Sequence, residues 1–194
     1  MNDVEKHIGE TWFSEHIATL TQHRDLQVLQ WEKPGTNTYS CRYVFDGNKM
    51  YISGDIGEAV FWLTWKADIH SFNDIHVGYF EEKLTAYSGQ RRDYDGTKAR
   101  QQLEDWRIEL IEEEVPFDID TFREMISAAE SCSSKEEWAL NCVNDEYSEF
   151  ISELEADYWE WIYNIGDKMP RRIIGYLVGL KMASKQLKEK SVVA

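Results

Sequence analysis

The chain has 194 residues and carries 36 Asp and Glu against 21 Lys and Arg, a formal net charge of −15 at pH 7. A hydrophobic content of 42% with eight tryptophans is typical of a folded protein and excludes a disordered one. The apolar runs are far shorter than the ~20 residues of a membrane-spanning helix. No secretory signal is evident, and three scattered cysteines fit reduced thiols, so we expect a cytoplasmic protein that does not enter a membrane.

The negative charge is concentrated in one segment. Residues 101–167 contain twenty acids and three bases, a balance of −17, whereas residues 1–100 have a balance of −4 and residues 168–194 one of +6. Such a segment repels a phosphate backbone, which argues against direct nucleic-acid binding by the acidic face. A basic surface on another macromolecule is the expected partner.

The first third of the chain predicts a helix followed by a sheet. Apolar residues recur every three to five positions, which indicates a helix from Asp3 to about Gln22. Runs of β-forming residues, separated by turn signals such as Asp46-Gly47-Asn48, then predict an antiparallel meander with strands at residues 26–32, 38–47, 49–53 and 58–65. The last run is nearly all apolar, so we expect a central strand that is covered on both faces.

Helical periodicity returns after the strands. A capping box at Ser71–Asp74 predicts a helix start, and a later helix with Leu103, Trp106 and Leu110 facing inward is expected to stop at Pro116. Further helices are predicted from near residue 120, after a second capping box at 134–137, at 144–165, and from 170 to about 188, the last one packed on its acidic neighbours. The fold class is therefore α+β, with a sheet-containing region at 1–115 and an acidic helical region at 116–194 within one compact unit.

The stretch Gly54-Asp55-Ile56-Gly57 suggests at first a phosphate loop or a catalytic aspartate. No Gly-Lys-Ser/Thr follows and the next segment is a strand, so we predict a turn in which Asp55 binds nearby amides. The five histidines and three cysteines lack metal-ligand spacing, and no serine lies in a nucleophile elbow. The sequence therefore predicts no catalytic residue, no metal and no cofactor. Acid–base chemistry would require Asp55, Asp93 or Asp95 to be buried together.

The predicted helix at 144–165 separates apolar from acidic residues. At 100° per residue, one face collects a core stripe formed by Val143, Tyr147, Ile151, Leu154, Tyr158, Trp161, Ile162 and Ile165. The opposite face collects Glu146, Glu149, Glu153, Asp157 and Glu160, without a lysine to relieve a repulsion of roughly 0.2–0.5 kcal/mol per neighbouring pair.

This acidic stripe would be about 21 Å long at ~1.5 Å per residue. Its acids would repeat at ~5–6 Å, comparable to the spacing of phosphates along one nucleic-acid strand. We interpret the stripe as a phosphate-backbone mimic. The alternative is an acidic face that only aids solubility.

Two aromatic residues, Trp159 and Tyr163, lie one turn apart beside these acids. They are either covered by the last helix or left exposed as a contact patch, in which case they are candidate anchors for a protein partner. Glu112, Glu113 and Glu114 are assigned to the same protein-binding surface.

Three stretches carry a family resemblance: "YISGDIGEAVFWLTW", "YFEEKLTAYSG" and "DYDGTKARQQLEDW". Over about residues 38–110 the chain resembles small accessory proteins encoded by bacteriophages and prophages, in which a G-D-x-G turn joins two strands and two helices follow. Leu84 stands where relatives often have cysteine. Some relatives are described as anti-CRISPR inhibitors of Cas9-type nucleases, and the resemblance implies that activity without assigning functional residues.

Charge, stripe and resemblance together predict a non-enzymatic, phage-encoded inhibitor that acts in the cytoplasm of the bacterial host. Its acidic helical half would enter the basic nucleic-acid channel of a CRISPR effector protein. One alternative is a small enzyme or ligand-binding protein with a pocket beside the sheet. Another is a self-assembling component, such as a homodimer with Trp159 and Tyr163 at a two-fold contact.

Overall fold

The computed structural model describes residues 2–193, except for the side chains of Asn141, Cys142, Asp145, Val192 and Val193. The chain divides into two compact units. Unit 1 combines the residues up to Arg91 with those from Pro170 onward, and unit 2 comprises residues 92–169. Unit 2 is thus an insertion, because the chain leaves unit 1 after Arg91 and returns to it at Pro170.

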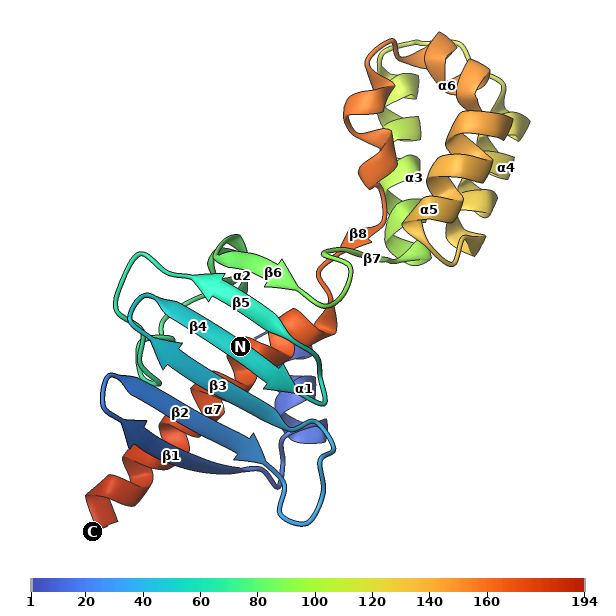
Figure 1. Ribbon diagram of the computed structural model, residues 1–194. Coiled ribbons are helices and arrows are strands. Elements are labelled where there is room, and N and C mark those ends of the chain that lie inside the picture. Colours follow the sequence, from blue (N-terminus) through green and yellow to red (C-terminus); the bar gives the residue numbers. More distant parts are fainter. Residues whose placement is uncertain (1, 194) are drawn as a thin grey trace. The chain divides into compact units, whose positions relative to one another are not determined.

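Unit 1 is built on a six-stranded antiparallel sheet in which each strand pairs with the next one along the chain (Figure 1). The strands are β1 (Ile17–His23), β2 (Leu26–Glu32), β3 (Cys41–Asp46), β4 (Lys49–Gly54), β5 (Ala59–Trp62) and β6 (Leu84–Tyr87). The predicted tight turn joins β3 to β4, with Asp46 opposite Lys49 and Gly47 at a φ of 60°. The meander is confirmed, with one more strand at each edge than the sequence predicted.

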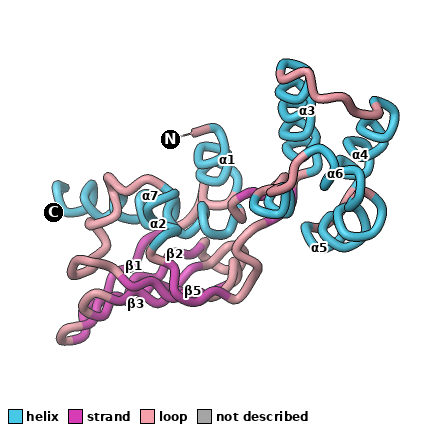
Figure 2. Tube along the Cα trace, turned by 90° about the horizontal axis from the view of Figure 1, so that it is seen from above, coloured by secondary structure: helices cyan, strands magenta, loops and turns pink. Residues whose placement is uncertain are grey.

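Three helices cover one face of this sheet (Figure 2): α1 (Asp3–Thr11), α2 (Val77–Glu82) and α7 (Arg171–Val193). The stretch of α7 from Ile173 to Leu180 is buried. Its close approach requires a glycine at position 179, where an added Cβ would lie 2.7 Å from the hydroxyl of Tyr43. The expectation that the last helix packs on the acidic neighbours is wrong, because its apolar side chains complete the core of unit 1.

The opposite face of the sheet carries half-buried and exposed side chains. Val44, Tyr51 and Val60 lie in register across it, and Trp62 on β5 is 60% exposed with the Lys49 ammonium 5.8 Å from its ring centroid. The prediction that β5 is covered on both faces is therefore wrong. Its outward residues are large and apolar, which makes a half-covered strand look like a fully buried one in the sequence.

The helix predicted to run from Asp3 to Gln22 ends at Thr11. The residues from Ile17 to His23 form β1 instead, since each of them pairs with a residue of β2. Sheet pairing outweighs the helical spacing of the apolar residues here. The helix start predicted at Ser71 is also wrong, because the Ser71 hydroxyl donates to the carbonyl of Asp68 in a turn and α2 begins only after the N-cap residue His76.

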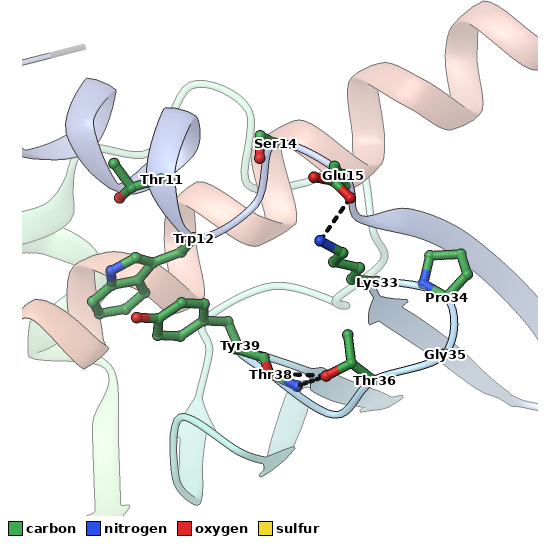
Figure 3. Close-up of a pocket in the computed structure, with 10 residues that line it drawn as sticks. All are labelled: Thr11, Trp12, Ser14, Glu15, Lys33, Pro34, Gly35, Thr36, Thr38 and Tyr39. Carbon is green, nitrogen blue, oxygen red and sulfur yellow. Dashed lines mark hydrogen bonds and ion pairs between the residues drawn. The ribbon is translucent and has the colours of Figure 1, made fainter.

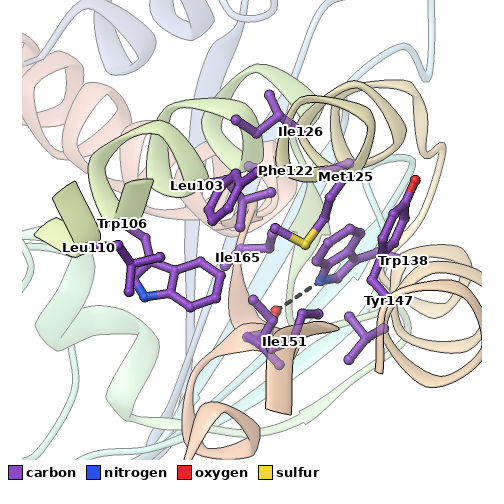
Figure 4. Close-up of a cluster of buried hydrophobic side chains, with 14 residues drawn as sticks. Leu103, Trp106, Leu110, Phe122, Met125, Ile126, Trp138, Tyr147, Ile151 and Ile165 are labelled. Carbon is purple, nitrogen blue, oxygen red and sulfur yellow. Dashed lines mark hydrogen bonds between the residues drawn. The ribbon is translucent and has the colours of Figure 1, made fainter. Parts of the chain in front are cut away.

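Unit 2 begins and ends in a two-stranded ribbon, β7 (Asp93–Tyr94) with β8 (Asp167–Lys168), and is otherwise helical. The helical segments between the strands are α3 (Gly96–Glu112), α4 (Ile119–Ser131), α5 (Lys135–Glu137), the π-helix η1 (Trp138–Glu146), α6 (Ser148–Leu154) and the 3₁₀ turns η2 (Tyr158–Glu160) and η3 (Ile162–Asn164). Their buried side chains, among them Leu103, Trp106 and Trp138, form one hydrophobic cluster (Figure 4).

This division differs from the expected boundary near residue 115. Helix α3 packs against α4 inside unit 2, and α7 belongs to unit 1. The cores of the two units are therefore interleaved along the chain, and a boundary drawn from changes in composition alone separates α3 from its own core. The predicted α+β fold class is confirmed.

The single helix predicted at 144–165 is wrong, because the segment is broken into η1, α6, η2 and η3. In one continuous helix the carbonyl of Ile162 would accept from the amide of Gly166. Instead the buried indole N–H of Trp138 donates to that carbonyl at 2.8 Å, and the Gly166 amide donates to Oε1 of Gln102 at 2.8 Å. Glu155 adopts extended backbone angles after α6. Two core side chains thus take over hydrogen bonds that a helix would use.

Candidate protein-binding surface

Unit 2 holds all of the net charge. Residues 92–169 contain 22 of the 36 acids and seven of the 21 bases, which leaves 14 acids and 14 bases for unit 1. Unit 1 is therefore formally neutral, and the balance of −15 lies on unit 2 alone. A charge of this size on a small unit creates a strong negative potential around it.

Six of the bases of unit 2 bind acceptor groups within the unit. Five of them form ion pairs: Arg100 with Glu130, Arg107 with Glu104, Arg123 with Asp120, Lys135 with Asp167 and Lys168 with Asp95. Lys98 also donates to the backbone carbonyl of Asp167. Three of these lysines bind at the β7–β8 ribbon, where the hydrogen bond from Lys168 holds the pKa of Asp95 below its usual value. The lysines therefore gather at the ribbon, whereas the three arginines bind acids on α3 and α4, and these ion pairs engage five of the acids of unit 2.

The five acids of the predicted stripe are all exposed in the structure: Glu146, Glu149, Glu153, Asp157 and Glu160. Within the described residues, none of them forms an ion pair with a lysine, an arginine or a histidine. This finding agrees with the absence of a neighbouring lysine in the sequence.

The straight alignment of these acids is not found. Glu149 and Glu153 lie one turn apart on α6, whereas Glu146 ends η1 and Asp157 and Glu160 belong to the turn around η2. The regular ~5–6 Å repeat of a single helix therefore holds only within α6. The acids are distributed over three short segments, which removes the geometric argument for a strand-like row of phosphates but keeps the charge.

Glu112, Glu113 and Glu114 follow directly at the C-terminal end of α3 and are exposed. A helix C-terminus carries partial negative charge from its last carbonyl groups and is stabilised by cations. Three glutamates at this position work against the stability of α3, and Glu114 in addition has a φ of 59°, which is unusual for a residue other than glycine.

The two candidate aromatic anchors have different environments. Trp159 is 58% exposed, whereas Tyr163 is half-buried against the core and its hydroxyl donates to Oδ1 of Asn144 at 2.7 Å. Trp159 is therefore available to a partner, and Tyr163 has a packing role. The sequence reading missed Ile108 and Ile111, which are about half exposed and lie one turn apart on α3, outside the inward row of that helix. Their position off the face formed by Leu103, Trp106 and Leu110 is the sequence signal that could have indicated their exposure.

The turn at Gly54-Asp55-Ile56-Gly57 joins β4 to β5, as predicted. Gly54 and Gly57 have φ values of 144° and 114°, and Oδ2 of Asp55 accepts from the amide of Tyr39 at 2.8 Å. Asp55 thus anchors the neighbouring loop. Asp93 is exposed, and Asp95 caps α3 and binds Lys168, so these carboxylates are not buried together as acid–base chemistry would require.

Three histidine and cysteine side chains are buried or hydrogen-bonded within the fold: His16, Cys41 and His70. Burial lowers the pKa of His16, whose Nε2 lies 3.2 Å from the carbonyl oxygen of Tyr39, and burial raises the pKa of Cys41 to about 12. His70 Nδ1 lies 2.8 Å from the hydroxyl of Ser184. The side chain of Cys142 lies outside the described residues. Among the side chains that are described, no group of three or more His, Cys, Asp or Glu could hold a metal ion.

Unit 1 has a pocket of about 530 Å³ beside the sheet, between the end of α1 and the loop that joins β2 to β3 (Figure 3). Its aromatic wall is Trp12 stacked on Tyr39, with ring centroids 4.8 Å apart and an angle of 4° between the planes. Its polar groups bind each other, since Lys33 pairs with Glu15 at 2.6 Å and the hydroxyls of Thr36 and Thr38 are 2.9 Å apart. Tyr39 has a φ of 55°, a strained value for an aromatic residue.

No family model matches the chain, and comparisons with curated proteins and with solved structures gave no match. In the part of the chain that the structure describes, none of the helices has the length and apolar character needed to cross a membrane.

Proposed function

We propose that the protein is a phage-encoded, non-enzymatic inhibitor of a host CRISPR effector nuclease, and that it binds the effector through the acidic surface of unit 2. The single observation that carries this proposal is the segregation of charge, with −15 on unit 2 and zero on unit 1. The class of target comes from the resemblance of residues 38–110 to phage accessory proteins. Channels that hold a guide–target heteroduplex are rich in lysine and arginine, and they offer the complementary surface.

The anatomy of unit 2 suits a protein interface better than a solubility surface. Stable interfaces combine a few exposed apolar or aromatic anchors with a surrounding of charged residues. Unit 2 exposes Trp159, Ile108 and Ile111 among its unpaired acids. In this arrangement the acids accelerate the encounter and set the orientation, while burial of the apolar side chains supplies much of the affinity.

The mechanism follows from competition for the same cationic groups. Arginines and lysines that would neutralise phosphates are occupied by carboxylates of unit 2, so target DNA or guide RNA no longer enters the channel. Because the acids form several short segments and not one straight row, the contact depends on total charge and shape more than on a phosphate-like repeat. Affinity is then expected to fall as salt increases, since screening weakens contacts between charged surfaces.

The test is binding of the purified full-length protein to a Cas9-type effector at increasing salt concentrations. The decisive variant reverses Glu149, Glu153 and Asp157 to lysine, which makes the net charge of unit 2 more positive by six. A matched control replaces Asp25, Glu32 and Asp74, three exposed acids of unit 1, by lysine and so changes the net charge of the chain by the same amount. We expect the first variant to bind at least ~tenfold more weakly and the control to bind like the wild type.

Two results would remove the proposal. Binding that does not change with salt would exclude an electrostatic contact. An equal loss of affinity in both charge-reversed variants would show that only the overall charge of the chain matters and not the surface of unit 2.

The second candidate function is the binding of a small polar ligand in the pocket of unit 1. The observation that favours it is Tyr39, which is held in a strained conformation by Asp55, by His16 and by the stacked ring of Trp12. Strain held in place at a pocket is a feature of many binding sites. Ligand-detected NMR with a panel of nucleotides and sugars tests this function, and a signal that persists in a Lys33→Ala, Tyr39→Asn double variant would count against the pocket.

A further inference from the structure

Unit 2 contains a pocket of about 350 Å³ within its acidic surface. Four of its lining residues, Gln102, Asp105, Trp106 and Glu109, lie on one face of α3, because they are spaced by three, four and seven positions. The remaining two, Glu155 and Trp161, come from the irregular segment after α6. The pocket therefore lies where α3 faces the segment that follows the end of α6.

Two tryptophans form a rigid corner of this pocket. The rings of Trp106 and Trp161 have their centroids 5.0 Å apart and meet at an angle of 75°. Trp106 is only 6% exposed and is backed by Phe122, with a centroid distance of 5.3 Å, and Trp161 packs against the same core. Indole rings held in this way attract a cation through the negative charge on their faces.

Three carboxylates surround the aromatic corner. Asp105 and Glu109 are exposed and Glu155 is half-buried. Among the described residues, none of the three has a cationic partner, and Asp105 accepts a hydrogen bond only from the neutral amide of Gln101. The nearest base along α3, Arg107, is paired with Glu104. The pocket thus combines two aromatic rings with an excess of negative charge that the unit itself does not balance.

We infer that this pocket receives the guanidinium group of a single arginine of the partner protein. A guanidinium is planar and weakly hydrated, so it stacks on an indole ring, and its five N–H donors match several carboxylate oxygens at once. A lysine ammonium has the charge but lacks the planar face. The inference rests on the proposed function, since it names the group that a basic effector channel presents to unit 2, and it identifies Trp161 and Glu155 as the residues that fix the position of the contact.

The experiment uses the full-length protein and blocked tripeptides that contain arginine, lysine or citrulline, the uncharged analogue of arginine. Indole N–H signals in NMR spectra report on each tryptophan separately, with Trp161→Phe used to assign the signal of that residue. We expect the arginine peptide to shift the Trp106 and Trp161 signals saturably, the lysine peptide to bind more weakly and the citrulline peptide to leave them unchanged.

Variants separate the pocket from the general negative charge. Glu155→Gln removes one charge inside the pocket, and Glu124→Gln removes one charge from an exposed position on α4 outside it. We expect Glu155→Gln to weaken binding of the arginine peptide about tenfold and Glu124→Gln to leave it unchanged. Equal effects of the two variants, or equal shifts with arginine and citrulline, would overturn the inference.

The outcome is distinguishable from that of the proposed function. An effector that binds the protein with salt-dependent affinity, while the arginine peptide produces no saturable shift, overturns the pocket and leaves the acidic surface in place. A peptide that binds as described supports the pocket even if the chosen effector does not bind the protein.

Discussion

Replacement of Glu153 by lysine is expected to stabilise unit 2 while it weakens the proposed interaction. Glu149 and Glu153 are exposed and lie four residues apart on α6, where two like charges repel by about 0.2–0.5 kcal/mol. Lysine at position 153 removes this repulsion and creates an attractive pair in the favourable order, with the acid nearer the N-terminus, for another ~0.2–0.5 kcal/mol. Position 153 is also in the last turn of α6, where a cation interacts favourably with the helix dipole.

These contributions add to an expected gain of about 0.7–2 kcal/mol in the free energy of unfolding of unit 2 at low salt. Hydrogen exchange of the backbone amides in unit 2 measures this quantity without interference from unit 1, which has its own core. Glu153→Gln provides the control, since it removes the repulsion without adding an attraction and should gain only about 0.2–0.5 kcal/mol. Binding to the effector is measured in parallel.

A destabilised Glu153→Lys variant would refute this reasoning, because it would show that Glu153 makes a stabilising contact within the fold. A variant that is more stable and still binds with unchanged affinity would show that this acid serves neither stability nor binding. The expected combination, greater stability with weaker binding, is typical of residues that are retained for function at the expense of the fold.

Three further predictions concern the framework. Gly54→Ala should destabilise unit 1 by at least ~1–3 kcal/mol, because the added Cβ would overlap the carbonyl oxygen of Ser40. Gly35→Ala, at a positive φ but in open space, should destabilise it less. Urea unfolding of the two variants measures the difference. The stability of unit 1 should fall as the pH drops below 6.5. Burial lowers the pKa of His16 in the folded state, so protonation favours the unfolded chain. His16→Gln should reduce this pH dependence. Trp138→Phe should cost about 1–3 kcal/mol, measured by hydrogen exchange in unit 2, because a buried carbonyl loses its indole donor.

Local sequence signals predicted the parts of the fold that depend on neighbouring residues. The Gly47-Asn48 hairpin and the Gly54–Gly57 turn follow from backbone angles that few other residues adopt, and the start of α5 follows from its capping residue, Ser134. Two elements could not be predicted because distant partners decide them. Residues 17–23 are a strand because β2 lies beside them, and at the end of the predicted helix Trp138 and Gln102 bind the carbonyl of Ile162 and the amide of Gly166.

The sequence predicted the charge of the candidate surface but not its shape. Counting acids along the sequence placed the excess at residues 101–167, inside the bounds 92–169 of unit 2, because a count of charges needs no knowledge of the fold. The exposure of Trp159 and the packing of Tyr163 required the structure, because residues one turn apart in a continuous helix are separated here by a change of backbone direction at Trp161. The pocket between Trp106 and Trp161 could not be found from sequence for the same reason.

The distribution of charge also bears on the choice between a binding surface and a solubility device. A surface that serves only solubility tolerates bases among its acids and gains stability from them through ion pairs and helix dipoles. Unit 2 instead places glutamates at the C-terminal end of α3 and repeats them on α6, while its lysines gather at the β7–β8 ribbon. Unit 1, made by the same chain and subject to the same demand for solubility, is neutral. The contrast between two units of one protein therefore favours a specific role for the negative charge of unit 2.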